Sequence, residues 1–237
     1  MACQLANHHD EIFKLNYLTL CMKINENLAE FMGIIIGDGN IQCSTERDKK
    51  KVYCISIAGD FSKDLDYHQN YINAIFYDLF KTSLRITNPK NNELTSRKYS
   101  KEIVLYLKSL GIPCGNKSRT CRIPEIILNS NKIMQARFIR GLADTDFCLM
   151  FKRKGKYPII KCGFASRLLT EDIEKLLRQL GFKFGHIVKE VYFDKRTKKY
   201  QYKSRIYIYG TKNLELWMKL IGFKNNRHLE KYNLWKN

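Results

Sequence analysis

Two aspartates, Asp38 and Asp146, stand in related surroundings at distant points of the chain. The first follows the segment FMGIIIG at 31–37, and the second follows IRGLADT at 139–145. Each segment places a glycine, then apolar residues, then a small residue directly before the aspartate. Carboxylates are oxygen ligands of Mg²⁺, and a divalent ion can promote phosphodiester hydrolysis. The pair is therefore the first candidate for chemistry.

The predicted position of each aspartate explains why a metal would be needed. Both follow helix-forming segments, so each carboxylate lies beside the negative end of a helix dipole. Two such carboxylates brought together would also repel each other, and a bound cation would relieve both effects. A single Gly-Asp-Gly sequence is more often a turn than a site, so the argument depends on the pair.

A second resemblance follows each aspartate, in the same order. Residues 107–112 (LKSLGI) are similar to residues 218–223 (MKLIGF). The aspartates are 146 − 38 = 108 positions apart, and the aspartate-to-glycine distances are 111 − 38 = 73 and 222 − 146 = 76. Two matches in matching order predict a chain with two duplicated halves.

The elements around the aspartates repeat as well. Asn27 is predicted to cap a helix over 28–37 that Gly39 ends. Alternating and β-branched residues predict the strands. The expected order in each half is αββαββα, giving antiparallel sheets in an α+β fold. The first half has the helix at 28–37, strands at 40–46 and 52–59, a helix at 62–80, two short strands and a helix ending near Gly111. The second half has helices at 132–144, 168–180 and 212–221 and strands at 147–153, 157–165, 186–193 and 200–208.

The expected divisions are an extension at 1–25, a first half at 26–128 and a second half at 129–237, with a linker near 121–131 where Pro124 disfavours a helix before it.

Small residues recur at helical spacing in both motifs. Gly33 and Gly37 are four positions apart, as are Gly141 and Thr145. That spacing puts them on one helix face, where another backbone can approach closely. We therefore expect the two motif helices to pack side by side and to bring Asp38 close to Asp146.

The composition indicates a polyanionic partner. The 237 residues include 42 Lys and Arg against 23 Asp and Glu, a net charge of +19. Nucleic acid is the commonest polyanion; a solvated basic surface or an anionic membrane is the competing interpretation. The sequence has no apolar run of membrane-spanning length and no visible secretory signal, so we expect an intracellular protein with no membrane partner. The eight cysteines form no C-x-x-C pair, which disfavours structural zinc.

At the two motifs the sequence resembles the LAGLIDADG homing endonuclease family in its single-chain, two-motif form. The motifs read FMGIIIGDG at 31–39 and IRGLADTDF at 139–147. The flanking segments GIPCGNKS at 111–118 and RIPE at 122–125 are also similar to the family, and the resemblance covers about residues 26–232. It implies two pseudo-symmetric halves with saddle-shaped sheets, and a monomer.

The resemblance also implies an activity and its residues. Asp38 and Asp146, with the backbone carbonyls of Gly37 and Thr145, would bind Mg²⁺ (or Mn²⁺ or Ca²⁺ in its place) beneath the minor groove of double-stranded DNA. Site-specific cleavage of a long, nearly asymmetric target would leave short 3′ overhangs. Two basic residues match positions beside the reacting phosphates: Lys117, for which a solvated loop lysine is the alternative, and Arg227, whose spacing slips by one residue.

Two residues of the second motif differ in type from those at the matching positions of the first motif. Phe147 replaces the glycine that usually closes the motif; because phenylalanine disfavours positive φ, either the turn is adjusted or the second site is impaired. Asp144 occupies an earlier acidic position that Ile36 fills in the first half. We therefore expect Asp144 to be non-catalytic.

Strand alternation and basic loops give the candidate DNA contacts. Long polar side chains on one sheet face can read base edges in the major groove, and loop lysines can contact phosphates. For any single residue, a solvated charged face is the competing interpretation. The candidates are Arg47, Lys49, Lys50, Arg85, Thr87, Arg97, Lys152, Lys154, Lys161, Gln201, Lys203, Arg205 and Tyr207.

Other functions were weighed against cleavage. An RNA-binding intron maturase, with intron RNA as its partner, is the main alternative: both aspartates favour cleavage, whereas Phe147 keeps the alternative open. A transcriptional regulator is less favoured because no helix-turn-helix is visible. We do not expect a protein-splicing element, because the chain neither starts with a splicing nucleophile nor ends in His-Asn.

Overall fold

The computed structural model describes residues 24–45, 51–88, 91–194 and 197–236. The candidates Arg47, Lys49 and Lys50, and nearly all of the expected extension at 1–25, lie outside the described residues. No helix of the described part of the chain is both long and apolar enough to cross a membrane.

The first αββαββα unit begins with the first motif helix and ends before Gly111. Its long middle helix is continuous but contains a π-helical segment, η1. The elements are α2 (Glu26–Ile36), β1 (Gly39–Thr45), β2 (Lys51–Asp60), α3 (Phe61–Asp66), η1 (Tyr67–Ile72), α4 (Asn73–Phe80), β3 (Arg85–Thr87), β4 (Glu93–Tyr99) and α5 (Lys101–Ser109).

The second unit repeats this order after a short helix in the connecting segment. A further helix, which the sequence analysis did not predict, ends the described chain. The elements are α6 (Glu125–Leu128), α7 (Lys132–Asp146), β5 (Cys148–Lys152), β6 (Tyr157–Phe164), α8 (Arg167–Gln179), β7 (Phe184–Asp194), β8 (Lys199–Tyr209), α9 (Thr211–Leu220) and α10 (Asn226–Lys236).

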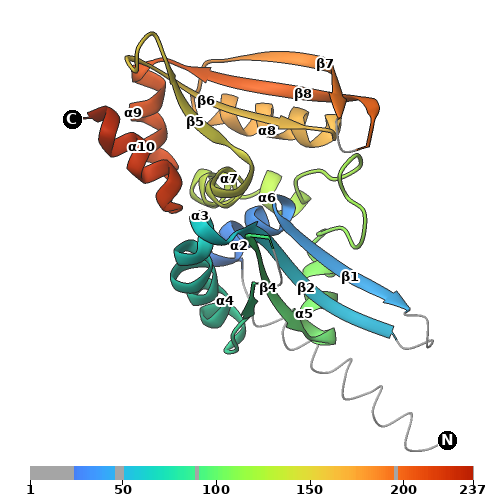
Figure 1. Ribbon diagram of the computed structural model, residues 1–237. Helices are drawn as coiled ribbons and strands as arrows, with labels where there is room; N and C mark the ends of the chain where they lie inside the picture. The colour runs from blue at the N-terminus through green and yellow to red at the C-terminus, as the bar shows by residue number, and fades with distance from the viewer. Residues whose placement is uncertain (1–23, 46–50, 89–90, 195–196, 237) are drawn as a thin grey trace, which may run out of the picture.

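Each unit forms a four-stranded antiparallel sheet with the same strand order. The first sheet runs β1-β2-β4-β3, and the second runs β5-β6-β8-β7. Figure 1 shows the two sheets on opposite sides of a central pair formed by α2 and α7. The α+β fold with two antiparallel sheets, predicted from the repeat, is confirmed.

The start and end of the first motif helix differ from the prediction. Asn25, not Asn27, caps the helix: its side chain accepts a hydrogen bond from the Leu28 backbone N–H, while Asn27 donates to Asp78 on α4 at 2.7 Å. The helix ends at Ile36 with Gly37 as its C-cap, so Gly39 begins β1 instead of ending the helix. A capping side chain accepts a hydrogen bond from the backbone N–H three residues after it, and Asn25 makes this bond with Leu28.

The contact between α2 and α7 is as close as the small residues predicted. A Cβ atom built on Gly33 would lie 2.1 Å from the Phe138 carbonyl oxygen, and one on Gly141 would lie 2.1 Å from the Glu30 carbonyl oxygen. No real Cβ makes such contacts, so the two backbones touch where the glycines are. The predicted packing of the motif helices is confirmed, and the core extends from this contact into both units.

Candidate active site and nucleic-acid interface

The close contact places the two aspartates at adjacent helix ends. Asp38 directly follows the C-cap Gly37, and Asp146 is the last residue of α7. A Cβ on Gly37 would lie 2.0 Å from Thr145 Oγ1 and 2.8 Å from Asp146 Oδ2. The sequence prediction that the two carboxylates meet at the interface therefore agrees with the geometry. Asp38 is partly exposed and Asp146 is exposed, so solvent reaches both.

The surroundings of both carboxylates favour the protonated form. Burial raises the pKa of Asp38 to about 6, with Arg227 opposing the shift, the nearby charge of Asp64 adding to it and Lys117 opposing it. Desolvation by neighbouring protein atoms, followed by repulsion from Asp38, raises the pKa of Asp146 to about 7, although part of the side chain remains exposed. When these carboxyl groups ionise, their negative charge is therefore not fully neutralised by the protein, and a bound cation would stabilise it.

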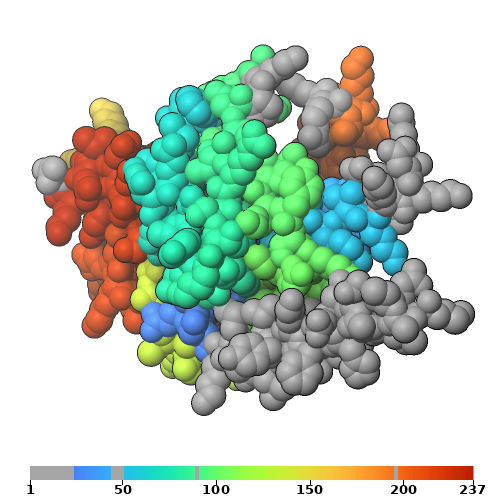
Figure 2. All heavy atoms as spheres, turned by 90° about the horizontal axis from the view of Figure 1, so that it is seen from below, coloured from blue at the N-terminus to red at the C-terminus, as the bar shows by residue number. Residues whose placement is uncertain are grey.

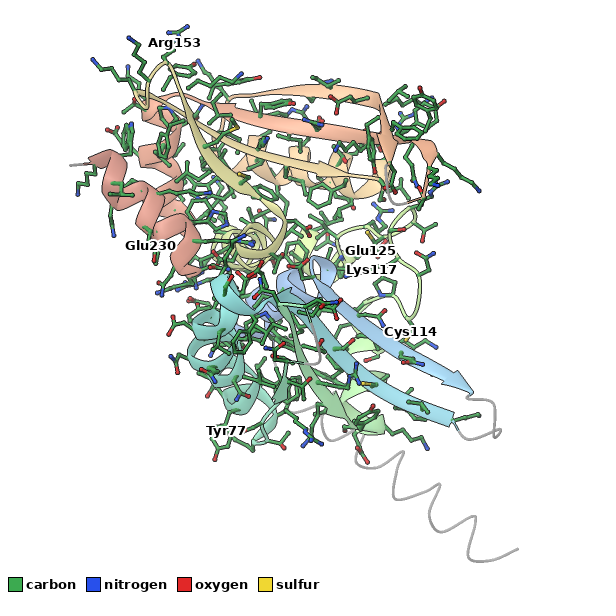
Figure 3. All side chains as sticks on the ribbon, in the orientation of Figure 1. Tyr77, Cys114, Lys117, Glu125, Arg153 and Glu230 are labelled. Atoms are coloured by element: carbon green, nitrogen blue, oxygen red, sulfur yellow. The ribbon has the colours of Figure 1, made fainter. Side chains whose placement is uncertain are left out.

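Two basic side chains cap the carboxyl ends of the motif helices. Lys117 Nζ donates to the carbonyl oxygens of Ile35, of Ile36 at 2.7 Å and of Gly37 at 3.0 Å. Cations are favourable at this end of a helix because its last carbonyls are unpaired and its dipole is negative. Burial lowers the pKa of Lys117 to about 8, although Asp146 and Asp38 oppose the shift. Figure 3 places Lys117 between the two sheets.

Arg227 makes the equivalent contacts in the second unit. Its guanidinium donates to the carbonyl oxygens of Asp144 and Thr145, both at 2.7 Å. The slip of one residue in the spacing therefore does not prevent Arg227 from reaching the end of α7. Both basic residues named from the sequence bond to the helix end of their own unit, and each acts electrostatically on both aspartates.

The donor set at the helix ends suits Mg²⁺. Among the described residues, no group of three or more His, Cys, Asp or Glu side chains is placed to hold a metal. Mg²⁺ does not require one, because it often binds through one or two carboxylates, water and substrate phosphates. The carbonyls of Gly37 and Thr145 are oxygen donors, but Lys117 and Arg227 already bond to them. Asp38 and Asp146 are therefore the residues whose chemistry suits Mg²⁺, because the protein does not fully neutralise their ionised carboxylates.

Asp144 has a different position from Asp146. Its fully buried carboxylate accepts hydrogen bonds from the backbone N–H groups of Lys224 at 3.0 Å and Asn225 at 3.1 Å. Burial raises its pKa to about 7, although these two hydrogen bonds oppose the shift. The geometry thus gives Asp144 a structural role, in agreement with its expected exclusion from catalysis.

Phe147 does not need the conformation that glycine would provide. Its backbone is extended, with φ −93° and ψ 162°. Its buried ring packs on Trp217 and Phe164, with centroids 5.7 and 6.2 Å away. Of the two alternatives for Phe147, this geometry agrees with the adjusted turn, because the chain leaves α7 through a region that any residue adopts.

The open face of the first sheet carries three of the candidates. Arg85 and Thr87 pair with Arg97 and Thr95 across β3 and β4, so all four point to the same face. Arg85, Thr87 and Arg97 are exposed. Four further polar residues share this face and were not predicted: Asn40, Gln42, Ser56 and Thr95. Their alternation with buried apolar residues (Ile41, Ile55, Ile57 and Leu94) was the sequence signal that could have identified them.

The open face of the second sheet carries most of the others. Lys161 pairs with Tyr207, and Gln201, Lys203 and Arg205 follow on the same side of β8. Ser204, Ile206 and Ile208 point to the opposite, buried side, as predicted from the alternation. Lys152 shares the open face at the end of β5, whereas Lys154 lies in the turn after it.

Two of these candidates already have neighbours on that face. Arg205 forms an ion pair with Glu190, and Lys203 Nζ lies 4.2 Å from the centroid of the Tyr192 ring. Such contacts hold the cations over the sheet in place. Glu190 also puts a negative charge on the face, so the interface is not uniformly basic.

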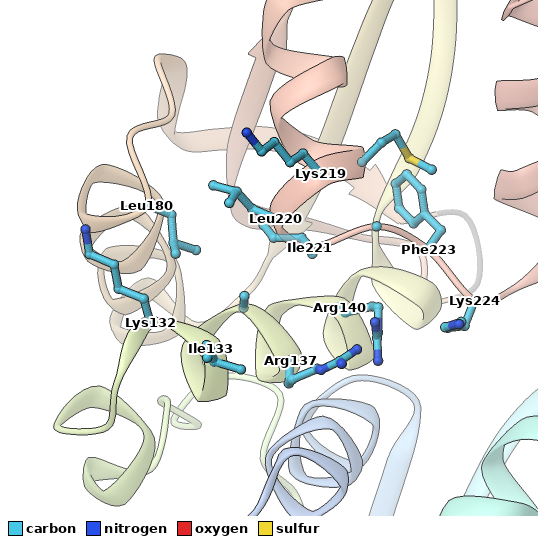
Figure 4. A pocket seen from close by; sticks show the side chains of 13 residues that line it. Lys132, Ile133, Arg137, Arg140, Leu180, Lys219, Leu220, Ile221, Phe223 and Lys224 are labelled. Atoms are coloured by element: carbon cyan, nitrogen blue, oxygen red, sulfur yellow. The ribbon is translucent and has the colours of Figure 1, made fainter.

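A groove beside α7 lies away from the aspartates. It has a volume of about 540 Å³, with Ala136, Leu180 and Phe223 in its lining and Lys132 and Lys219 beside them (Figure 4). Neither Asp38 nor Asp146 lines it. The groove therefore takes no part in the site described above.

Comparison with curated proteins finds relatives of much greater length. No family model matches the chain. It is 31% identical over 166 residues to ribonucleoside-diphosphate reductase NrdEB subunit alpha of Bacillus subtilis (strain 168), covering 67% of this chain and 15% of the reductase subunit. It is 28% identical over 210 residues to the replication factor C small subunit of Methanocaldococcus jannaschii, covering 87% of this chain and 10% of that protein. The chain thus spans a small part of each relative.

Solved structures show the same fold. The structure of I-DmoI in complex with DNA and Ca covers 90% of this chain and 98% of its own, with a TM-score of 0.63 and 17% identity. I-SmaMI bound to an uncleaved DNA target in the presence of calcium ions covers 90% of each chain, with a TM-score of 0.53 and 11% identity. These structural neighbours are LAGLIDADG homing endonucleases, and the fold expected from the paired motifs is confirmed.

Proposed function

We propose that this chain, which has the fold of the LAGLIDADG homing endonucleases, is a site-specific endonuclease that hydrolyses both strands of duplex DNA with Mg²⁺. The single observation that supports this most is the meeting of Asp38 and Asp146 at adjacent helix ends, each with a basic side chain beside it. Helix capping accounts for Lys117 and Arg227, but a closely packed pair of helices has no need of two carboxylates at the same place. A divalent ion that acts on a phosphodiester does need them.

Each charged group has a role in this reaction. Asp38 and Asp146 would hold Mg²⁺, which when bound supplies an activated water and stabilises the leaving oxygen. Lys117 and Arg227 would neutralise charge on the phosphates that approach the helix ends. The adjacent positions of the two carboxylates suit phosphates that face each other across a narrow minor groove. Cleavage there would give short 3′ overhangs.

The sheet faces would bind the duplex on either side of these residues. Their amide, hydroxyl and cationic side chains can read base edges, and the net charge of +19 attracts the phosphate backbone. I-DmoI and I-SmaMI have been solved with DNA, I-DmoI also with Mn, which supports this use of the fold. Because the two units differ in sequence, we expect a long, nearly asymmetric target bound by a monomer.

The curated relatives also agree with an independent nuclease. By name, they are a reductase subunit and a replication factor, which differ in activity. A segment shared by such different proteins is best explained by an activity of its own. We therefore transfer neither the reductase nor the replication activity to this chain.

Cleavage of a library of long DNA duplexes with Mg²⁺ tests the proposal. Wild type should cut both strands, and Asp38→Asn and Asp146→Asn should each lose at least one cut. Glu171→Gln, at an exposed acidic residue of α8 that pairs with Arg167, is the control and should cut normally. Cleavage that survives both aspartate substitutions would reject the assignment. Tight binding of intron RNA without DNA cleavage would support the maturase alternative instead.

A further inference from the structure

We propose that Asp64 and Asp172 are positioning residues, each holding the loop that delivers the basic side chain of the opposite unit's active site. Asp172 of the second unit holds the loop with Lys117, and Asp64 of the first unit holds the loop with Arg227. The inference rests on the endonuclease function proposed above. It adds a role for two carboxylates that do not belong to the motifs.

The first loop follows α5 and crosses to α8. Arg122 donates to the two carboxylate oxygens of Asp172 at 3.1 and 3.3 Å, and the Ile123 backbone N–H donates to the same group at 3.0 Å. Ser166, the N-cap of α8, donates to the Cys121 carbonyl at 2.5 Å. Three consecutive residues of the loop are therefore fixed to the second unit.

Lys117 is coupled directly to this anchored segment. The Cys121 backbone N–H donates to the Lys117 carbonyl at 2.9 Å, closing a turn between them. The Lys117 side chain then returns to the first unit, where it caps α2. The direction in which Lys117 leaves the loop is thus set by contacts with the other unit.

The second loop follows α9 and crosses to α3. Asp64 accepts a hydrogen bond from the Asn225 side chain at 2.8 Å and lies 3.5 Å from a terminal nitrogen of Arg227. Asn226 donates to Asp66 at 2.8 Å in the same region. Figure 2 shows the C-terminal segment beside the first unit, and α10 packs against α3.

Arg227 is therefore held between the two units. One terminal nitrogen of its guanidinium lies near Asp64 of the first unit, and the other donates to the carbonyls at the end of α7. Asp144 of its own unit also holds the Arg227 loop through Lys224 and Asn225, but in both loops contacts with the opposite unit complete the placement of the basic side chain. Correct docking also brings the two aspartates together, so the complete site forms as one assembly.

Cleavage of each strand, measured separately in single-turnover reactions, tests the proposal. Lys117→Met and Arg227→Met first show which strand depends on which basic residue. Asp172→Ala should then slow the Lys117-dependent strand, and Asp64→Ala the Arg227-dependent strand, by about tenfold or more, because a small displacement of a catalytic group is costly. Asp172→Asn and Asp64→Asn keep one acceptor and should lose less. Affinity for DNA should stay near that of wild type.

Hydrogen exchange gives a readout that does not depend on cleavage. Asp172→Ala should speed exchange in residues 117–123 and leave 223–228 unchanged, and Asp64→Ala should do the reverse. If Asp172→Ala does not fold, Arg122→Ala, a change at an exposed residue, replaces it, and Asp64→Asn, which keeps one acceptor, replaces Asp64→Ala. If wild type cuts no DNA, the proposed function fails, but the exchange pattern still decides whether the loops are anchored across the interface. Equal slowing of both strands, or unchanged exchange in the anchored loop, would overturn the inference.

Discussion

Arg140 of α7 and Glu30 of α2 form a buried ion pair across the contact between the two units. The guanidinium Nε donates to a Glu30 carboxylate oxygen at 2.8 Å, and the Tyr71 hydroxyl donates to the same oxygen at 2.8 Å. Glu30 is 1% exposed and Arg140 is 8% exposed. The pair thus adds charge-assisted hydrogen bonds to the glycine contact and ties α2, α7 and η1 together.

Loss of one partner of this pair should be costly. Glu30→Gln leaves the Arg140 charge buried without a counter-ion, which we expect to lower the free energy of unfolding by about 3–5 kcal/mol. Urea unfolding measures it. The matched control is Glu26→Gln in the more exposed pair with Arg137, where the cost should stay below about 1 kcal/mol. Equal losses in the two variants would contradict the assigned difference in burial.

A methyl group at the helix contact should separate the units. In Gly141→Ala the new Cβ would meet the Glu30 carbonyl oxygen at 2.1 Å, so the helices must move apart. Overpacking of this kind costs about 1–3 kcal/mol, and we also expect reduced DNA cleavage because the aspartates separate. Thermal unfolding and cleavage rates test this. Gly163→Ala is the milder control, because its Cβ would meet Arg205 Cγ at 3.2 Å and a shift of a few tenths of an ångström relieves that contact, so its melting temperature should fall less than that of Gly141→Ala.

Stabilisation by a divalent ion should increase with pH. The pKa values of about 6 for Asp38 and about 7 for Asp146 lie above the ordinary value of 3.8. Between 3.8 and the raised value of each group, the folded chain therefore binds more protons than the unfolded chain. Their contribution to the stability of the metal-free protein is therefore complete at low pH and is lost as pH rises through about 6 to 7. A divalent ion binds the ionised carboxylates, so its effect should appear over the same range.

Melting temperatures with and without Ca²⁺ check this expectation. The increase caused by Ca²⁺ should be small near about pH 5 and larger near about pH 8. The double variant Asp38→Asn, Asp146→Asn should show no such increase at either pH. An increase that is independent of pH, or that persists in the double variant, would place the ion elsewhere.

The open face of the second sheet should account for part of the salt dependence of DNA binding. Lys161→Ala should weaken binding, and if its side chain contacts a phosphate the slope of log affinity against log salt should fall by about one. Lys175→Ala, an exposed lysine on α8, is the control because it lies on the helix that covers the buried face of that sheet. Fluorescence anisotropy at several salt concentrations measures both. Equal effects of the two substitutions would mean that net charge alone, and not this face, binds DNA.

Local patterns in the sequence were sufficient for the element order and for the aspartate pair. Helical periodicity, strand alternation and small residues four positions apart are short-range signals, and they predicted the two αββαββα units and the α2–α7 contact. The same signals could not decide whether the helix starts after Asn25 or after Asn27. Both residues can cap a helix, and only the backbone conformation determines which one does. They also gave no indication of α10, which lies within the expected second half at 129–237 but was not predicted as a helix.

Long-range contacts decided the rest of the site. That Lys117 and Arg227 both reach helix carbonyls, that Asp144 turns inward, and that Asp64 and Asp172 hold loops of the opposite unit all depend on residues far apart in the chain. No periodicity of 2 or 3.6 residues encodes such pairings, because they join residues that are distant in the chain and meet only in the tertiary structure. The sequence by itself determined which carboxylates could do chemistry; the tertiary structure decided which cations lie beside them, since charges act through distance in space and not along the chain.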